Sequence, residues 1–98
     1  MKINQMRNNA EEACSLLKAL AHPHRLMIVC QLAEKERSVG ELAEFLELRD
    51  STVSQHLSLM RRDGIVHARR DGQTLWYSIK NDKAQMIIDL LYKIYCPA

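Results

Sequence analysis

The chain has 98 residues, with 14 Lys and Arg against 12 Asp and Glu and a formal net charge of +2. This length predicts a single domain over residues 1–98, whose small core would benefit from a second subunit. No apolar run reaches the length of a membrane span, and the first residues lack the apolar middle of a signal peptide. We therefore expect a cytoplasmic protein without a membrane partner. In that reducing compartment, the three cysteines are expected to be free thiols rather than a disulfide framework.

The charge is unevenly distributed along the chain. Residues 31–48 carry five Glu against two basic residues, a net charge of −3. Residues 49–80 carry six basic residues against three Asp, a net charge of +3. The basic stretch could contact phosphate or could be an ordinary solvated face, so its predicted structure has to decide between these two roles.

Helical spacing of apolar residues predicts three helices in the first half of the chain. The first covers about residues 8–20, and Pro23 suits the first position of a second helix that runs to about residue 34. Ser38 and Glu41 form a capping box, in which each side chain accepts a hydrogen bond from the backbone of the other residue. This box is expected to begin a short third helix.

A fourth helix is predicted after a tight turn. Asp50 or Ser51 is expected to cap its start, and Gly64 is expected to end it in a left-handed conformation. Its narrow apolar stripe consists of Val53, Leu57 and Met60. Two short helices joined by a tight turn are typical of a helix-turn-helix.

A β-hairpin is predicted next, because the apolar pattern changes from helical spacing to alternation. Residues 65–70 and 73–79 flank Asp71-Gly72, a dipeptide favoured in two-residue type I′ turns. That loop would place Val66 opposite Tyr77 on the core side. The tip of the hairpin would project from the body as a wing.

The last predicted helix, about Asp82 to Cys96, is apolar over most of its circumference. A small domain cannot bury so much apolar surface alone, so we expect a homodimer through the first and last helices. The alternative is a terminal helix that lies across its own core. The complete prediction is a mainly α fold with a small β-hairpin, a winged helix-turn-helix with the element order ααααββα.

The fourth helix and the wing carry the side chains expected to contact double-stranded DNA. Short hydrogen-bonding side chains can contact base edges in the major groove, and arginines suit guanine or phosphate. The candidate DNA-binding residues are Arg49, Ser51, Thr52, Ser54, Gln55, His56, Arg61 and Arg62, with Arg69, Arg70 and Gln73 on the wing. For the helix alone a solvated polar face is equally plausible, but the wing and the local positive charge favour DNA.

The chain has no recognisable sequence pattern for metal binding or catalysis. His22 and His24 flank Pro23, His56 and His67 stand apart, and the chain lacks Cys-x-Cys and Cys-x-x-Cys. We therefore expect helix-start and surface roles for the histidines, with no metal site and no cofactor. The lack of a nucleophile triad, a phosphate loop or a recognisable carboxylate pair predicts that the protein is not an enzyme.

The three cysteines are predicted to lie in different environments. Cys30 falls on the apolar face of the second helix, where a free thiol usually packs as a small hydrophobic group. Cys96 lies at the exposed end of the last helix, and Cys14 is expected to pack on the first helix. Three cysteines allow three different pairs, and periodicity does not choose among them.

Four segments together resemble the ArsR (ArsR/SmtB) family of dimeric winged-helix repressors. They are Leu-Leu-Lys-Ala-Leu-Ala-His-Pro-His-Arg-Leu at 16–26, Ser-Val-Gly-Glu-Leu at 38–42, Ser-Thr-Val-Ser-Gln-His-Leu at 51–57 and Arg-Arg-Asp-Gly-Ile-Val at 61–66. Val29-Cys30, together with the segment at 90–96 that ends in Cys96, resembles the branch of this family that senses persulfides and related oxidants through a dithiol.

This resemblance implies a DNA-binding transcriptional repressor that binds operator DNA as a homodimer. It also implies that Cys30 and Cys96 are the sensing dithiol, joined within one subunit by a disulfide or polysulfide bridge when reactive sulfur species or other oxidants act as effector. Thr52, Ser54 and Gln55, together with His56, would approach the bases.

Two alternatives remain open from the sequence. The first is a metal-responsive repressor of the same fold, although metal-sensing members carry Cys-x-Cys on the third helix, where this chain has Val39-Gly40-Glu41. The second is a dimeric protein-interaction module that does not bind DNA.

Overall fold

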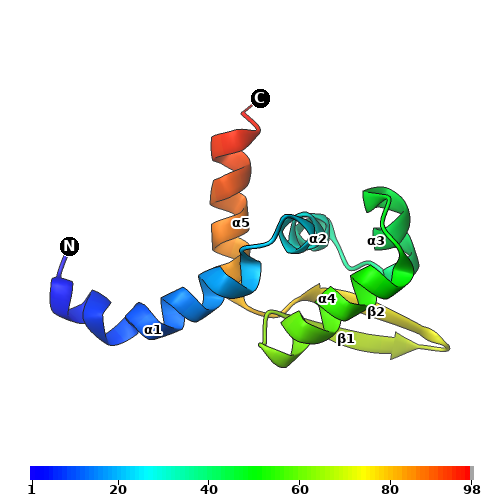
Figure 1. Cartoon of the computed structure of the whole chain (residues 1–98), viewed down its shortest axis with the longest axis horizontal. Coiled ribbons are helices and arrows are strands. Elements are labelled where there is room, and N and C mark those ends of the chain that lie inside the picture. The colour runs from blue at the N-terminus through cyan, green and yellow to red at the C-terminus, as the bar shows by residue number, and fades with distance from the viewer. Residues whose placement is uncertain (98) are drawn as a thin grey trace.

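The computed structural model describes residues 1–97 and has the predicted element order. The elements are α1 (Ile3–Leu20), α2 (Pro23–Glu34), α3 (Val39–Leu46), α4 (Asp50–Arg62), β1 (Val66–Asp71), β2 (Thr74–Ile79) and α5 (Asp82–Tyr95). Helices α2, α3 and α4 form a body with the antiparallel hairpin, whereas α1 and α5 project from that body in different directions (Figure 1). The winged helix-turn-helix prediction is confirmed.

The core lies where α2, α3, α4 and the hairpin meet. The predicted stripe of α4 is buried, since Val53, Leu57 and Met60 are each 0% exposed. They belong to one buried cluster with Ile28 of α2 and Leu42 of α3, among others. The apolar periodicity of the sequence therefore identified the inner face of α4 correctly.

The first helix starts earlier than predicted, and the second starts where predicted. Helix α1 begins at Ile3 rather than near residue 8, and its first turns are exposed without a side-chain cap. Pro23 is the first residue of α2, as predicted. His22 caps this helix, because its Nδ1 accepts a hydrogen bond from the backbone N–H of His24 at 3.1 Å. The sequence predicted a helix-start role for His22, and the structure shows that this role is a side-chain cap.

The predicted cap at the start of α3 is confirmed, whereas the one predicted at the start of α4 is wrong. Both hydrogen bonds of the Ser38 and Glu41 capping box are present, at 3.2 Å each. In contrast, α4 starts at Asp50, and Arg49 precedes it without a side-chain cap. Asp50 lies in the first turn, where a carboxylate interacts favourably with the positive end of the helix dipole.

The hairpin has a different register from the one predicted. Tyr77 pairs with Ala68 rather than Val66, and Val66 pairs with Ile79. The two-residue loop is therefore Gly72-Gln73, not Asp71-Gly72. Gly72 has φ of 65° and takes the first loop position, which is where a type II′ turn requires glycine. The shift is two residues, so Val66 and Tyr77 still face the core.

A buried arginine, which the sequence analysis did not single out, joins the hairpin to the helices. The backbone of Arg37 pairs with that of Tyr77 through two hydrogen bonds of 3.0 and 2.8 Å. Its guanidinium forms a salt bridge with Glu34 at 2.8 Å and lies over the Phe45 ring. Arg37 thereby fixes the base of the wing against α2 and α3.

Helix α5 leaves much of its apolar surface exposed. Asn81 caps the helix by accepting hydrogen bonds from the backbone of Lys83 and Ala84, and Ala84 and Ile88 are buried. Its exposed apolar side chains are Met86, Leu90, Tyr92, Ile94 and Tyr95. Within residues 1–97, no helix combines the length and hydropathy needed to cross a membrane.

Candidate nucleic-acid interface

The outer face of α4 carries most of the side chains expected to contact DNA. The helix buries Val53 and Leu57 on one side, which turns the polar side chains between them outward. Ser51, Gln55, Arg61 and Arg62 are exposed, as is Arg49 just before the helix, whereas Thr52 and Ser54 are half-buried at its edges. This polar surface is the candidate recognition surface of α4.

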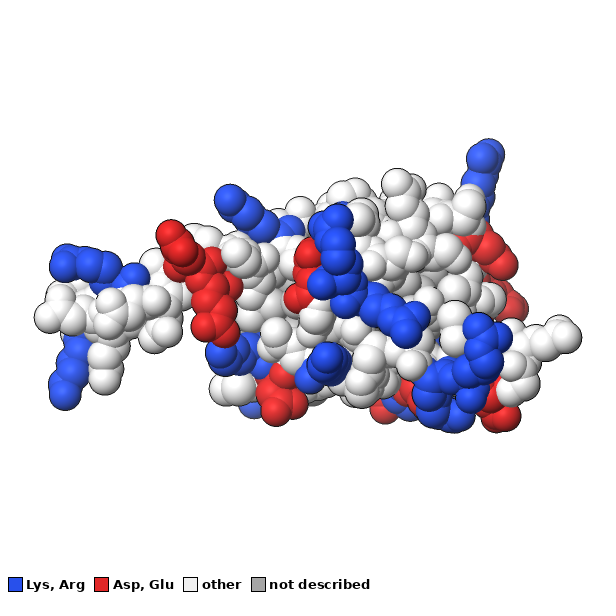
Figure 2. Space-filling view, turned by 90° about the horizontal axis from the view of Figure 1, so that it is seen from below, with Lys and Arg blue, Asp and Glu red and all other residues white. Residues whose placement is uncertain are grey.

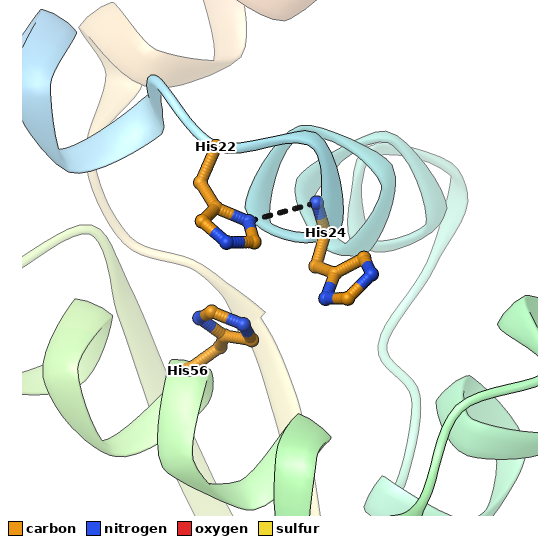
Figure 3. Close-up of side chains that lie close together, drawn as sticks. All are labelled: His22, His24 and His56. Atoms are coloured by element: carbon orange, nitrogen blue, oxygen red, sulfur yellow. Dashed lines mark hydrogen bonds between the residues drawn. The ribbon is translucent and has the colours of Figure 1, made fainter.

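His56 does not share this outward position. Its Nδ1 accepts a hydrogen bond from Nε of Arg25 at 3.2 Å, and its ring lies 4.6 Å from that of His22, centroid to centroid. Figure 3 shows the side chain directed from α4 towards the start of α2. Burial lowers the pKa of His56, and the neighbouring His22, Arg25 and His24 lower it further. The structure therefore places the His56 ring between two helices, and its approach to bases stays a prediction.

The wing presents two of its three predicted DNA-binding side chains freely. Arg70 and Gln73 are exposed. Arg69 is exposed as well, but its Nε donates to both carboxylate oxygens of Glu36 at 3.0 and 3.1 Å. The hydrogen bond from Arg69 holds the pKa of Glu36 below its usual range, and the same bond raises the pKa of Arg69. Arg69 thus joins the wing to the loop between α2 and α3.

The face that bears α4 and the hairpin carries basic side chains across its middle and at its wing end, with acidic groups between them (Figure 2). Arg62 lies 3.3 Å from Asp63, so the charge there is partly compensated. This arrangement suits electrostatic contact with a polyanion through several separate arginines.

The three thiols are free and lie in distinct surroundings. Cys14 is exposed on α1, Cys30 is half-buried on α2 and packs against the core, and Cys96 is exposed at the end of α5. Burial raises the pKa of the Cys30 thiol, and the charge of Cys96 raises it further. Helix α2, which carries Cys30, packs against α5, which has Cys96 at its C-terminal end.

Comparison with known proteins decides the family. Residues 22–68 match the model for "Bacterial regulatory protein, arsR family". Over 98 residues the chain is 44% identical to the transcriptional activator HlyU of Vibrio cholerae, and the alignment covers 100% of this chain and 91% of that relative. The chain belongs to the ArsR family.

Two further ArsR-family proteins resemble it along most of their length. A biofilm growth-associated repressor of Agrobacterium fabrum is 47% identical over 91 residues, which cover 93% of this chain and 78% of that protein. The crystal structure of the repressor BigR from Xylella fastidiosa matches with a TM-score of 0.93 and 41% identity, and the match covers 100% of both chains. This ArsR-family protein is therefore a transcriptional regulator and not an enzyme.

One cluster in this ArsR-family structure was not expected from the sequence. His22, His24 and His56 bring ring nitrogens to within 4.8 Å of one another (Figure 3). The sequence shows no metal-ligand spacing for these residues because His56 lies on a different helix from the other two. The His-x-His spacing at the start of α2 was visible, but the packing of α4 on α2 was needed to find the third ring.

Proposed function

We propose that this ArsR-family regulator is a homodimeric repressor that binds double-stranded operator DNA and loses affinity when Cys30 and Cys96 become linked. The observation that carries the proposal is the packing of α2, which bears Cys30, against α5, whose C-terminal end bears Cys96. Their effector would be a reactive sulfur species or another thiol oxidant. The resemblance to the persulfide-sensing branch of the family supports the same pair.

The dimer in this proposal forms through α1 and α5. Both helices project from the body and expose apolar side chains, including Leu17 of α1 and Leu90 and Ile94 of α5. A patch of this kind favours association with a second copy. A twofold dimer must place its two recognition helices about 34 Å apart to fit successive major grooves.

The different environments of the two thiols set the order of the chemistry. Cys96 is exposed, so its thiolate attacks the outer sulfur of a persulfide, RSSH, and the thiolate RS⁻ leaves. Cys96 then carries the persulfide. The half-buried Cys30 attacks the inner sulfur, which forms the Cys30–Cys96 disulfide and releases hydrogen sulfide. A further sulfane sulfur from a second donor would give a polysulfide bridge instead.

The Cys30–Cys96 bond would weaken DNA binding by changing the geometry of the dimer. Cys30 belongs to α2 in the DNA-binding body, whereas Cys96 ends α5, whose exposed face forms the dimer contact in this proposal. A covalent bond between them restrains the angle between body and dimer contact. The spacing of the two α4 helices depends on that angle, so a small rotation reduces the fit to the operator.

The test is to treat the reduced protein with glutathione persulfide, locate any new sulfur bond by peptide mass spectrometry and titrate the operator. The proposal expects a bond between Cys30 and Cys96 together with weaker operator binding. A Cys14→Ser variant is the matched control and should respond like the wild type, because Cys14 lies on a different helix from both thiols. Formation of the Cys30–Cys96 bond with unchanged operator affinity would contradict the proposal.

A further inference from the structure

The start of α2 and the middle of α4 bring three imidazoles together in one cluster. His22 is the N-cap residue of α2, His24 lies in its first turn, and His56 faces them from α4 (Figure 3). Their potential ligand nitrogens all lie within 4.8 Å of one another, and all three residues are half-buried. The ring centroids are 5.1 Å apart for His22 and His24, and 5.7 Å apart for His24 and His56.

We propose that His22, His24 and His56 bind one divalent transition-metal ion, of which Zn²⁺ is the type. Neutral imidazole is a ligand suited to Zn²⁺, Ni²⁺, Cu²⁺ and Co²⁺, whereas Mg²⁺ and Ca²⁺ prefer oxygen ligands. Three histidines leave a fourth tetrahedral position, which water would occupy.

The backbone positions of these ligands are fixed by packing. Pro23 stands between the two histidines of α2 and holds the first turn, while His22 has the extended backbone of a helix cap. Ile28 of α2 and Leu57 of α4 are both 0% exposed in the same core cluster, so the two helices that carry the histidines are held together by the core. Only side-chain rotation is then needed to adjust the three rings.

The adjustment required is small. Three nitrogens bound at Zn–N distances of about 2.1 Å in a tetrahedron lie roughly 3.4 Å from one another. The rings must therefore close by up to about 1.4 Å from the largest separation that the structure allows. The half-buried position leaves a path for an ion from solvent.

Metal coordination would replace the hydrogen bonds that the His22 and His56 rings now accept. Nδ1 of His22 accepts from the backbone of His24, and Nδ1 of His56 accepts from Arg25, so in each neutral ring the proton is on Nε2. Binding through Nε2 moves that proton to Nδ1, with no net release, and both accepted hydrogen bonds end. The ion then replaces Arg25 as the link between α2 and the recognition helix.

A substitution at His24 tests the metal site most directly. His22 also caps α2 and His56 also accepts from Arg25, whereas within residues 1–97 the ring of His24 forms no hydrogen bond. His24→Gln therefore removes a ligand without removing either contact. His67, exposed on the wing, provides the control variant His67→Gln.

The experiment measures Zn²⁺ binding by the reduced full chain, without an affinity tag, in competition with a chromophoric chelator. We expect one ion per chain for the wild type and for His67→Gln. We expect His24→Gln and His56→Gln each to bind at least about tenfold more weakly, since even outer contacts of a metal site are worth that much. Thermal unfolding without metal checks that each variant folds. If His56→Gln does not fold, the zinc affinity of His24→Gln alone decides the test.

A Co²⁺ titration identifies the ligands independently of affinity. Imidazole ligation gives visible d–d absorption without the intense near-ultraviolet band that a thiolate ligand adds. That band would mean that the cysteines hold the ion, and it would overturn the proposal. Failure of the wild type to bind stoichiometrically, or equal affinity in a folded His24→Gln variant, would overturn it as well. None of these readouts depends on DNA binding or on the proposed thiol switch.

Discussion

Arg69 on the wing donates from its Nε to both carboxylate oxygens of Glu36, which lies 33 residues earlier in the loop between α2 and α3. The pair connects the acidic stretch of the sequence to the basic one. Arg69 is exposed and Glu36 is only half-buried, so the pair contributes little to stability, but it occupies a guanidinium that could otherwise contact phosphate. Its neighbour Arg70 is exposed on the same strand.

The two wing arginines should therefore differ in their contribution to DNA binding. Arg70→Ala is expected to lower the salt dependence of operator binding by about one unit of slope, as loss of one phosphate contact does. Arg69→Ala should lower it less, because Glu36 already neutralises Arg69. Fluorescence titrations of labelled operator across a range of salt concentrations measure both slopes. A larger loss for Arg69→Ala than for Arg70→Ala would show that the ion pair opens on DNA.

Gln55 on the outer face of α4 is expected to contact a base. Glutamine can form two hydrogen bonds with adenine, so Gln55→Ala should weaken specific binding by about 1–3 kcal/mol. Binding to a duplex of scrambled sequence should change little. Equal losses on the operator and on the scrambled duplex would instead indicate that Gln55 contacts only the backbone of DNA.

Leu90 tests the dimer contact on α5. Its side chain is 57% exposed in the single chain, so Leu90→Asp should leave the fold of a subunit intact. A charge at an apolar contact should favour monomers, which sedimentation velocity measures. Asp89→Asn, on the polar stripe of the same helix, is the control and should remain dimeric. A dimeric Leu90→Asp variant would place the contact elsewhere.

The raised pKa of Cys30 predicts how ring closure depends on pH. Only a thiolate attacks a disulfide, and burial, which raises the pKa of Cys30, keeps this thiol protonated around neutral pH even when Cys96 is blocked. In a Cys14→Ser protein whose Cys96 carries thionitrobenzoate, attack by Cys30 releases the coloured thiolate. The release rate should rise about tenfold per pH unit while Cys30 remains mostly protonated. A rate that stops rising below about pH 8.5, where an ordinary cysteine thiol is half ionised, would exclude a raised pKa at Cys30.

Local sequence signals predicted the parts of the fold that depend on neighbours along the chain. The Ser38 and Glu41 box, Pro23 at the start of α2 and the buried stripe of α4 each involve residues within two helical turns. The hairpin turn was also local, but Asp71-Gly72 fits one two-residue loop and Gly72-Gln73 fits another. The register followed the glycine at the first loop position.

Contacts between segments far apart in the chain could not be predicted from local sequence signals. His56 was assigned to DNA because it stands among polar residues of α4, yet the packing of α4 on α2 turns it towards Arg25. The pairing of Arg69 with Glu36 likewise depends on where the wing meets the loop before α3. For the candidate site, the sequence thus predicted which elements carry it, and tertiary packing decided which side chains remain free.

The operator affinity of the reduced protein and of the same protein carrying a mapped Cys30–Cys96 bond tests the central claim most directly. We predict that the linked wild type binds the operator at least about tenfold more weakly, a coupling free energy of roughly 1.4 kcal/mol. Dithiothreitol should restore the affinity, and Cys30→Ser treated with the same persulfide should retain it. A fully linked protein that binds as tightly as the reduced one would contradict the account.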